Sequence, residues 1–341
     1  MWYEFLIDKG LLPKSVIKNS VKYMLNKYIS NSSKLSDSEI LKIQKDFCLK
    51  HSHGPVAKST DDANNQHYQF PIEFFKTVLG PKLKYSGSFF ENQSSNLENA
   101  EIASLEKYTQ YSELKNDESI LELGCGWGSL SLYIATNFPN TQITSITNSK
   151  IQYKYINEII NSKKLNNIQI VHSNINEFNT YKKYDKIISI EMFEHMFNTK
   201  KLLELTYKWL KPRGSLFFQV FSHKSYPQDF DQINTSWMSK YFFTNGMMPY
   251  DGFYNEINSQ FILDKSWIEN GKHYSKTLYA WLENLDNNYS ELVNITPNIN
   301  NKLLNRWKLF FIICGELFAY KDGTEWYIKQ YLLKKENKNN K

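Results

Sequence analysis

Apolar runs of strand length alternate with segments of helical periodicity from about residue 118 onward. Strands are expected at Ser119–Leu123, Gln142–Thr147, Ile168–His172, Asp185–Ile190 and Gly214–Val220. Helices are expected between them at Ser129–Asn137, Lys150–Ser162 and Lys200–Leu210, the last one stopped by Pro212 and Gly214. This alternation predicts an α/β fold with a mostly parallel, doubly wound sheet. Because such crossovers are right-handed, the carboxyl ends of the strands are expected to form a cleft.

The residues before this pattern indicate a helical extension. Residues 1–50 have the spacing of short amphipathic helices, with a turn at Asn31–Ser33 and an N-cap at Ser36 that is followed three residues later by Glu39. Residues 51–69 have no periodicity, which is typical of a linker. We therefore expect residues 1–69 to form an extension and linker, residues 70–334 to form the main domain, and residues 335–341 to be a disordered tail.

A second irregular segment covers residues 221–260. It is long, rich in aromatic residues and turns, and a segment of this kind is usually functional, so we expect a cap over the active site. After it, strands are expected at Gln260–Glu269 and Glu325–Lys334, and helices at Ser275–Asn288 and Asn301–Ala319. The two later strands bring the expected sheet to seven.

Composition excludes several classes of protein. The chain has 341 residues, of which 41% are hydrophobic and 22% charged, as in an ordinary folded protein. A net charge of +6 is spread along the chain, which argues against nucleic acid as a partner. The three cysteines lie far apart, and two histidines in a polar loop, His51 and His53, do not make a metal site, so neither a disulfide framework nor a metal is expected.

The same sequence gives an expectation for location. Charged residues among the first thirteen break the apolar core that a secretory signal needs. The longest apolar run, Leu309–Cys314, is far short of the ~20 residues that span a bilayer. A cytoplasmic protein without stable membrane insertion is expected, although peripheral contact with lipid stays open, as does the oligomeric state.

The first strand leads directly into a glycine-rich turn, Gly124–Gly128, and then into a helix. Glycines let the backbone turn tightly and approach a ligand, while the start of the helix offers free N–H groups, so a nucleotide-type cofactor is expected here. The third glycine comes one residue too early for the dinucleotide fingerprint, and the second strand ends in Thr147-Asn148-Ser149 without an acidic residue, which disfavours NAD. A P-loop is excluded because no Gly-Lys-Ser/Thr follows.

A group of ionisable residues follows the fourth strand: Glu191, Glu194 and His195. Residues after a strand end point into the cleft, so two carboxylates and an imidazole are expected to lie where a cofactor presents its reactive group. A helix N-terminus favours acidic residues through its dipole, which explains Glu191 and Glu194 but leaves His195 unexplained. We therefore predict a proton-transfer site.

The glycine turn resembles motif I of S-adenosyl-L-methionine (SAM) methyltransferases. Methyl transfer from a sulfonium is an in-line displacement in which the protein aligns the nucleophile and keeps it unprotonated. An amine of pKa ~10 is neutral in only about one molecule in a thousand at pH 7, a penalty of ~4 kcal/mol. Glu194 and His195 are therefore predicted to remove the proton, and Glu191 to orient the ammonium by its charge.

Residues from about 70 to 334 resemble the coclaurine N-methyltransferases, which are themselves similar to the cyclopropane-fatty-acyl-phospholipid synthases. The segments that carry the resemblance are Phe70–Phe74, Leu97–Ala103, Gly124–Gly128, Thr147–Ser149, Glu191–Met196, Gly271–Ser275 and Gly323–Trp326. The resemblance implies a Rossmann-like methyltransferase that uses SAM and releases S-adenosyl-L-homocysteine (SAH). It implies cofactor-binding residues at Tyr85, Ser86, Gly124, Cys125, Gly126, Gly128, Thr147, Asn148, Gln152, Asn174, Ile175 and Glu191.

The expected substrate is a small, aromatic or alkaloid-like amine. Ring faces favour a cationic amine by about 0.5–2 kcal/mol each, and aromatic candidates are numerous: Phe89, Phe90, Phe193, Trp237, Phe253, Trp307, Phe311 and Trp326.

The lipid synthases look as if they need a Cys and a His to hold bicarbonate, whereas this chain has Gly87 and Val220 there, preceded by Gln219 where the N-methyltransferases usually have Glu. Methyl or methylene transfer to unsaturated acyl chains is the first alternative, and a non-catalytic SAM-binding module is the second. The Asn/Asp-Pro-Pro-Tyr/Phe motif of nucleic-acid and protein amide methyltransferases is absent.

Overall fold

A computed structural model of the chain describes residues 4–58, 70–92, 95–230, 236–258, 260–296 and 299–336. The chain forms two compact units that are interleaved in sequence. Unit 1 consists of Met1–Glu39, Phe70–Ala103 and Glu269–Tyr327, and unit 2 of Ile40–Gln69, Ser104–Ile268 and Ile328–Lys341. Phe70 begins one of the stretches of unit 1. The division into an extension, a main domain and a tail stays a prediction, and its residues 59–69 and 337–341 lie outside the described parts.

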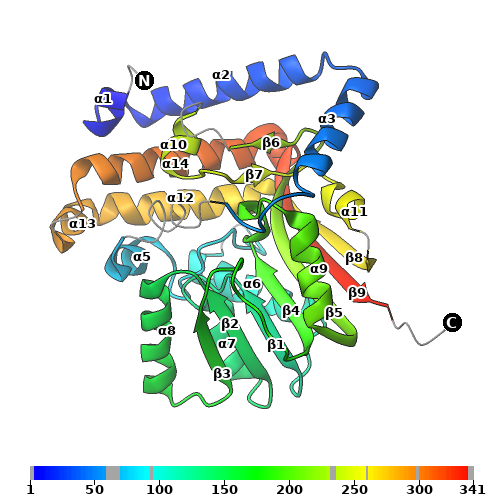
Figure 1. Cartoon of the computed structure of the whole chain (residues 1–341). Helices are drawn as coiled ribbons and strands as arrows, with labels where there is room; N and C mark the ends of the chain where they lie inside the picture. Colours follow the sequence, from blue (N-terminus) through cyan, green and yellow to red (C-terminus); the bar gives the residue numbers. More distant parts are fainter. Residues whose placement is uncertain are drawn as a thin grey trace. The chain divides into compact units, whose positions relative to one another are not determined.

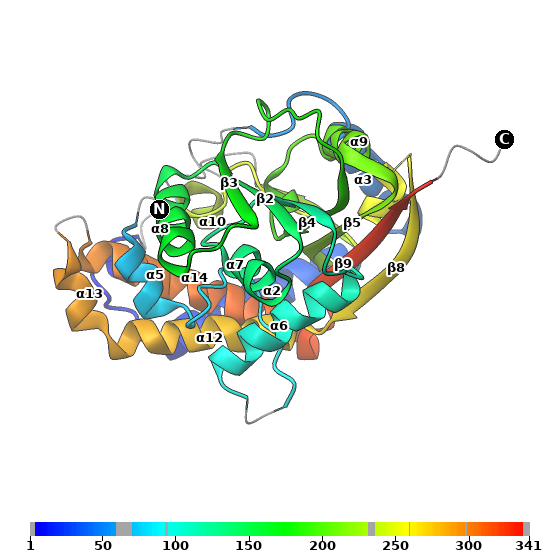
Figure 2. The same ribbon diagram turned by 90° about the horizontal axis from the view of Figure 1, so that it is seen from below.

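Unit 2 contains a seven-stranded sheet in the order β3-β2-β1-β4-β5-β9-β8 (Figure 2). The strands are β1 (Ser119–Leu123), β2 (Gln142–Thr147), β3 (Ile168–His172), β4 (Tyr184–Ile190), β5 (Leu210–His223), β8 (Phe261–Glu269) and β9 (Trp326–Lys335). The first five strands of this order pair in parallel. The expected α/β fold with a mostly parallel sheet is confirmed, and three of its strands have the expected bounds.

The central strands are buried on both faces, as a parallel sheet covered by helices requires. On β1, Leu121 and Leu123 belong to one apolar cluster, and Ile120, the residue before Leu121, belongs to another on the opposite face. The helices of unit 2 that follow the strands are α7 (Ser129–Asn137), α8 (Lys150–Lys163) and α9 (Thr199–Trp209). α7 has the expected bounds.

The expected end of the last of these helices is wrong. α9 ends at Trp209, and β5 begins at once at Leu210, which pairs with Tyr184. The next register pair is Ser215 with Lys186, so the residues from Lys211 to Gly214 bulge out of the strand. Pro212 and Gly214 therefore shape a bulge within β5 rather than a loop before it, because a bulge tolerates a missing N–H group and an extra residue.

The expected cap contains short elements. They are β6 (Gln228–Asp229), α10 (Trp237–Tyr241), β7 (Met247–Met248) and α11 (Phe253–Ile257), while residues 231–235 and 259 are not described. β6 and β7 pair antiparallel. Asp229 accepts a hydrogen bond from Lys50 Nζ at 2.7 Å and lies 2.9 Å from His51 Nε2. These contacts attach the cap to the end of α3 (Asp37–Lys50).

Unit 1 is helical in its described part. Its helices are α1 (Glu4–Asp8), α2 (Lys14–Ser32), α5 (Ile72–Val78), α12 (Gly271–Asn287), α13 (Tyr289–Ile295) and α14 (Asn301–Ala319), and the first residues of α6 (Leu97–Tyr111) also belong to it. α2, α14 and α12 run side by side (Figure 1). α2 buries Val21, Leu25 and Ile29, which share one helix face at four-residue spacing.

Two expectations about the first fifty residues have different outcomes. The turn predicted at Asn31–Ser33 is wrong for its first two residues, because α2 continues to Ser32, whose hydroxyl hydrogen-bonds to the carbonyl of Tyr28 one helical turn earlier. The N-cap at Ser36 is confirmed. The Glu39 carboxylate accepts a hydrogen bond from the Ser36 N–H at 2.8 Å, and the Ser36 hydroxyl accepts one from the Glu39 N–H at 3.4 Å.

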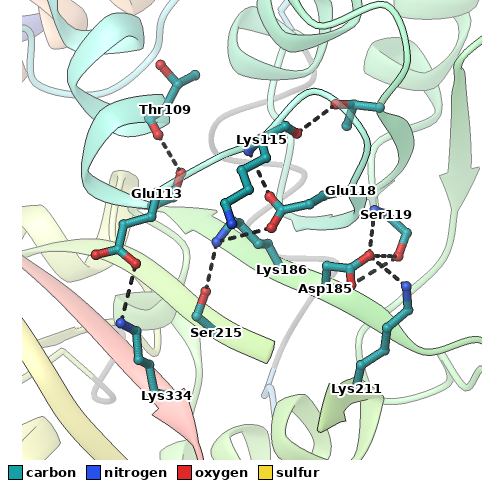
Figure 3. Close-up of polar contacts among 12 residues, drawn as sticks. Thr109, Glu113, Lys115, Glu118, Ser119, Asp185, Lys186, Lys211, Ser215 and Lys334 are labelled. Carbon is teal, nitrogen blue, oxygen red and sulfur yellow. Dashed lines mark hydrogen bonds and ion pairs between the residues drawn. The ribbon is translucent and has the colours of Figure 1, made fainter. Parts of the chain in front are cut away.

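Charged residues gather at the amino ends of the central strands, at the edge opposite to the glycine turn (Figure 3). Asp185 accepts hydrogen bonds from the Ser119 N–H at 2.8 Å and from Lys211 Nζ at 2.7 Å. Lys186 is buried and lies 3.6 Å from the Glu118 carboxylate. Burial lowers the pKa of Lys186, and burial raises that of Asp185, although hydrogen bonds from Lys211 and Ser119 outweigh it and leave the pKa of Asp185 lowered. This cluster joins β1, β4 and β5 at the edge that carries no predicted site residue.

Candidate cofactor and proton-transfer site

The predicted site residues of unit 2 lie at the carboxyl ends of β1 to β5. Because these strands are parallel, the segments that follow them meet at one edge of the sheet. The glycine turn after β1 is fixed to the neighbouring strand β2, since the N–H groups of Gly124 and Cys125 both donate to the carbonyl of Ile146, at 3.1 and 3.0 Å. The turn therefore has a defined position at the carboxyl edge of the sheet, between β1 and β2.

The three glycines of the turn all have positive φ, a region that L side chains avoid: +75° at Gly124, +53° at Gly126 and +83° at Gly128. Their surroundings differ. A Cβ at Gly124 would lie 2.7 Å from Met192 Cγ, and one at Gly128 would lie 3.0 Å from Ile156. A Cβ at Gly126 meets no described protein atom within 4 Å. Gly124 and Gly128 are therefore needed for packing, whereas Gly126 leaves backbone open for the approach of a ligand.

The end of β2 presents a second polar group. Thr147 Oγ1 donates to Gln152 Oε1 at 2.7 Å and accepts from the Ser149 N–H at 3.1 Å, which fixes the start of α8. Gln152 Nε2 is buried and has no hydrogen-bond partner among the described residues. The side-chain oxygen of Gln152 accepts from Thr147, so its buried NH₂ group is left to donate to another acceptor. Asn148 is half-buried beside it.

Asn174 follows β3 and makes the contacts of a turn residue. Its side-chain oxygen accepts from the Asn176 N–H at 3.0 Å, and its carbonyl accepts from Phe178 N–H at 2.9 Å. Ile175 is half-buried and packs against the core. The predicted cofactor contact of this pair stays a prediction.

Glu122 is a buried acid that the sequence analysis did not single out. It lies on β1, two residues before Gly124, and accepts hydrogen bonds from Ser145 Oγ at 3.0 Å and from Ser131 Oγ. Burial raises its pKa to about 7 despite these bonds. A single acidic residue within an otherwise mostly apolar strand is a signal that the sequence contains, because a carboxyl group buried in a sheet needs hydrogen-bond donors beside it.

Glu191 directly follows β4 in a left-handed conformation, with φ +51°. Its N–H donates to the carbonyl of Gln219 on β5 at 2.9 Å, and its Oε1 accepts from Gln219 Nε2 at 2.9 Å. A non-glycine residue in this region is strained, and such strain persists where neighbouring groups hold it. Gln219 is the neighbour that holds both the backbone and the side chain of Glu191.

Glu194 lies in the short helix η2 (Phe193–His195) and is wholly buried. Its Oε1 accepts from the Phe221 N–H at 2.8 Å, while Oε2 has no partner among the described residues. Burial raises the pKa of Glu194 well above its usual value, and the charge of Glu191 raises it further. Burial and the neighbouring Glu191 therefore both favour the protonated form of Glu194.

His195 is half-buried and contacts an aromatic residue of the cap. Its ring lies 4.8 Å from that of Phe243 in an edge-on arrangement. Phe243 in turn contacts Phe221 at 5.7 Å and Phe230 at 5.2 Å, and all three phenylalanines are partly exposed. These three phenylalanines lie within the predicted aromatic cap, but nothing in the sequence distinguishes them from the other aromatic residues there.

The aromatic residues that were predicted for substrate contact in unit 2 are more deeply buried. Phe193 is wholly buried and stacks on Phe218 at 4.6 Å. Phe253 is wholly buried and packs against Phe47 at 5.0 Å. Trp237 is buried next to Phe242. These three side chains have packing roles in the core and the cap, and their contact with substrate stays a prediction.

The remaining predicted residues belong to unit 1: Tyr85, Ser86, Phe89, Phe90, Trp307, Phe311 and Trp326. Within that unit, the Tyr85 ring lies 5.6 Å from Trp281 and 6.3 Å from Trp307, which is 5.5 Å from Phe311. The hydroxyl of Ser86 accepts a hydrogen bond at 2.9 Å from Lys84, a buried lysine that the sequence analysis missed.

The other predicted aromatics of unit 1 also have partners within it. The N–H of Phe90 donates to His273 Nδ1 at 3.2 Å, and the Phe89 ring lies 4.7 Å from the His273 ring. Trp326 contacts Tyr320 at 5.6 Å. These side chains therefore have defined places in unit 1.

The mostly parallel seven-stranded sheet with a glycine turn after its first strand is the Rossmann-like fold of SAM-dependent methyltransferases. Residues 57–326 match the protein family described as mycolic acid cyclopropane synthetase. The chain belongs to this family.

Curated relatives and solved structures agree with this assignment. The chain is 32% identical over 341 residues to (S)-coclaurine N-methyltransferase of Thalictrum flavum subsp. glaucum, covering 96% of this chain and 94% of the relative. It is 25% identical to the cyclopropane-fatty-acyl-phospholipid synthase of Escherichia coli K12, over 77% of this chain and 66% of the relative. The structure of a coclaurine N-methyltransferase bound to N-methylheliamine and SAH is 30% identical, with a TM-score of 0.92 over 97% of this chain and 98% of that one. The protein is a SAM-dependent methyltransferase, and its cofactor is SAM.

The described residues contain no helix long and apolar enough to cross a bilayer. No cluster of three histidine, cysteine, aspartate or glutamate side chains in the described ranges has the arrangement of a metal site.

The pKa of Glu122 predicts a pH dependence of stability. A carboxyl group whose pKa rises from about 4.5 unfolded to about 7 folded stabilises the fold below pH 4.5, and this contribution is lost as the pH rises through 7. Relative to Glu122→Gln, the wild-type chain is therefore expected to lose about 2–3 kcal/mol of unfolding free energy between pH 5 and pH 8. Urea unfolding of both chains at the two pH values measures this loss, and an equal pH dependence would contradict it.

Gly126 and Gly128 form a matched pair for testing the cofactor site. Gly126→Ala is expected to weaken SAM binding at least 10-fold, because its Cβ enters the open backbone region and its positive φ is disfavoured by about 1–2 kcal/mol. Gly128→Ala meets Ile156 instead and should mainly lower the melting temperature. Calorimetric titration with SAM and thermal unfolding measure both effects. A larger loss of SAM affinity in Gly128→Ala than in Gly126→Ala would contradict the assignment.

Proposed function

We propose that the protein transfers the methyl group of SAM to the nitrogen of a small amine of aromatic or alkaloid-like type. The observation that carries this proposal is the contact between the glycine turn and the segment Glu191–His195. The contact is so close that a Cβ at Gly124 would overlap Met192, at 2.7 Å from its Cγ. A cofactor on the turn would have the ionisable side chains beside it. The N-methyltransferase relatives, which match nearly the whole chain, support nitrogen as the acceptor.

Within this proposal the three ionisable residues have different tasks. SAM supplies a methyl group on a positively charged sulfur, and the amine attacks it with a lone pair. The ammonium form must first lose a proton. Burial raises the pKa of Glu194 and so favours its protonated form, which cannot accept that proton. His195, which is half-buried, is the acceptor that we propose, while Glu194 holds the segment through the Phe221 N–H. The carboxylate of Glu191 orients the ammonium by charge.

The aromatic residues beside His195 suit such a substrate. Phe221, Phe230 and Phe243 are partly exposed, in contrast to the buried Phe193 and Phe253. A cationic amine over a ring face gains about 0.5–2 kcal/mol. We therefore add these three residues of unit 2 to the proposed substrate contacts, with those of unit 1 kept as predicted. A cytoplasmic location also stays a prediction.

Transfer to an unsaturated acyl chain is the second candidate, because the family includes lipid-modifying relatives. Against it stand Gly87 and the pair Gln219-Val220, where the resemblance to the lipid synthases implies Cys and His. A screen with methyl-labelled SAM against benzylisoquinoline-like amines, simple alkylamines and unsaturated phospholipid vesicles tests both candidates. Label in a methylated amine supports the proposal, label in extractable lipid favours the second candidate, and label in neither, with SAM still bound, indicates a binding module.

Variants of the proposed base, His195, and of Glu194, which holds its segment in place, test the mechanism. His195→Ala combined with Glu194→Gln is expected to lower turnover by about 10²-fold or more, because proton removal by a positioned base contributes about 10²–10⁴-fold. The affinity for SAM should stay within about twofold of wild type. Single-turnover rates and calorimetric SAM titrations measure the two quantities, and Lys211→Ala at the opposite edge of the sheet is the control. A collapse of SAM binding would show that the two residues are structural.

A further inference from the structure

Two buried glutamines form a chain of hydrogen bonds that ends at Glu191. Gln330 on β9 donates from Nε2 to Gln219 Oε1 at 2.8 Å, and Gln219 on β5 donates from Nε2 to Glu191 Oε1 at 2.9 Å. Gln330 is wholly buried and Gln219 is 1% exposed. The strands β9, β5 and β4 are neighbours in the sheet, and Gln219 is the register partner of Ile190, the residue before Glu191. We name these three residues the amide relay.

The direction of the amide relay follows from its last member. Glu191 Oε1 accepts from Gln219 Nε2, so Gln219 turns its NH₂ group toward Glu191 and its oxygen toward Gln330. Gln330 must then donate in turn, which leaves Gln330 Oε1 buried without a partner among the described residues. A buried carbonyl without a partner is unfavourable and calls for an explanation. The charge at the other end of the chain provides it.

The backbone of Glu191 adds to the same arrangement. Glu191 has φ +51°, and its N–H donates to the carbonyl of Gln219. Gln219 therefore holds Glu191 at two points, which fixes a strained residue whose carboxylate is only half-buried. Glu194 on η2 interacts electrostatically with Glu191, and burial favours its protonated form, which lessens repulsion between the two carboxyl groups.

We propose that Gln219 and Gln330 are positioning residues that hold the Glu191 carboxyl group in one orientation, toward the ammonium group of the substrate. This inference rests on the proposed function for the role of Glu191, but the relay itself is a property of the fold. The inference gives Gln219 a positioning role, at a position where the N-methyltransferases that the chain resembles usually have Glu.

The kinetic test uses methionine, which matches the length of glutamine without its polar atoms. With an amine that the wild-type enzyme methylates, Gln219→Met is expected to raise KM for the amine about 10-fold, and Gln330→Met about threefold, with KM for SAM changed less than twofold. Because Gln330 acts only through Gln219, the double variant should equal Gln219→Met alone. Gln169→Met, an exposed glutamine on β3, is the control and should change neither constant.

Two kinetic outcomes would overturn the inference. Multiplicative losses in the double variant would show that Gln330 acts independently of Gln219. A rise of KM for SAM in step with that for the amine would show a general structural role.

A second measurement is independent of activity. Glu191 and Gln330 are linked only through Gln219 in the described hydrogen bonds, so their substitutions should be coupled if the relay exists. The melting-temperature shifts of Glu191→Leu and Gln330→Met are expected to differ from additivity by at least 2 °C in the double variant. Additive shifts would reject the relay. If the wild-type enzyme methylates no amine, the proposed function fails, but these melting temperatures still test whether the amide relay exists.

Discussion

The close approach of Gly124 to Met192 is the contact on which the site depends. The glycine turn belongs to β1 and the ionisable segment to β4, and their strands are neighbours in the sheet. A side chain at position 124 would force the two segments apart, because its Cβ would lie 2.7 Å from Met192 Cγ. The missing side chain thus allows the glycine turn and the segment Glu191–His195 to lie together, while the hydrogen bonds to Ile146 keep the turn in place.

A second constraint is the unequal burial of two carboxyl groups. Glu194 is wholly buried and Glu191 only half-buried, so burial favours the protonated form of Glu194 although the two residues are three positions apart. The fold produces this difference through its backbone: the left-handed turn at Glu191 directs one side chain outward, and η2 directs the next one inward. The same sequence in a regular helix would place both on one side.

The parts that could be predicted from the sequence are those that a local rule decides. β1, β2 and β3 have the expected bounds because short apolar runs between helices leave few alternatives, and the glycine turn carries its own backbone requirement. The bulge in β5 could not be predicted, since it depends on the register with β4 across the sheet. The amide relay and the phenylalanines around His195 depend on which side chains of distant segments meet, and a single sequence does not contain that information.

The interleaving of the two units has a consequence for how the chain folds. Unit 1 needs the stretch that ends at Tyr327, and unit 2 needs the strand that continues from Ile328, which lies between β5 and β8 in the sheet. Neither unit is therefore complete until β9 has left the ribosome, so unit 1 and unit 2 cannot fold one after the other during synthesis. Its nascent chain must keep apolar strands and helices from aggregating for longer than a protein of consecutive domains does, and damage to β9 would disrupt an interior strand that joins β5 to β8.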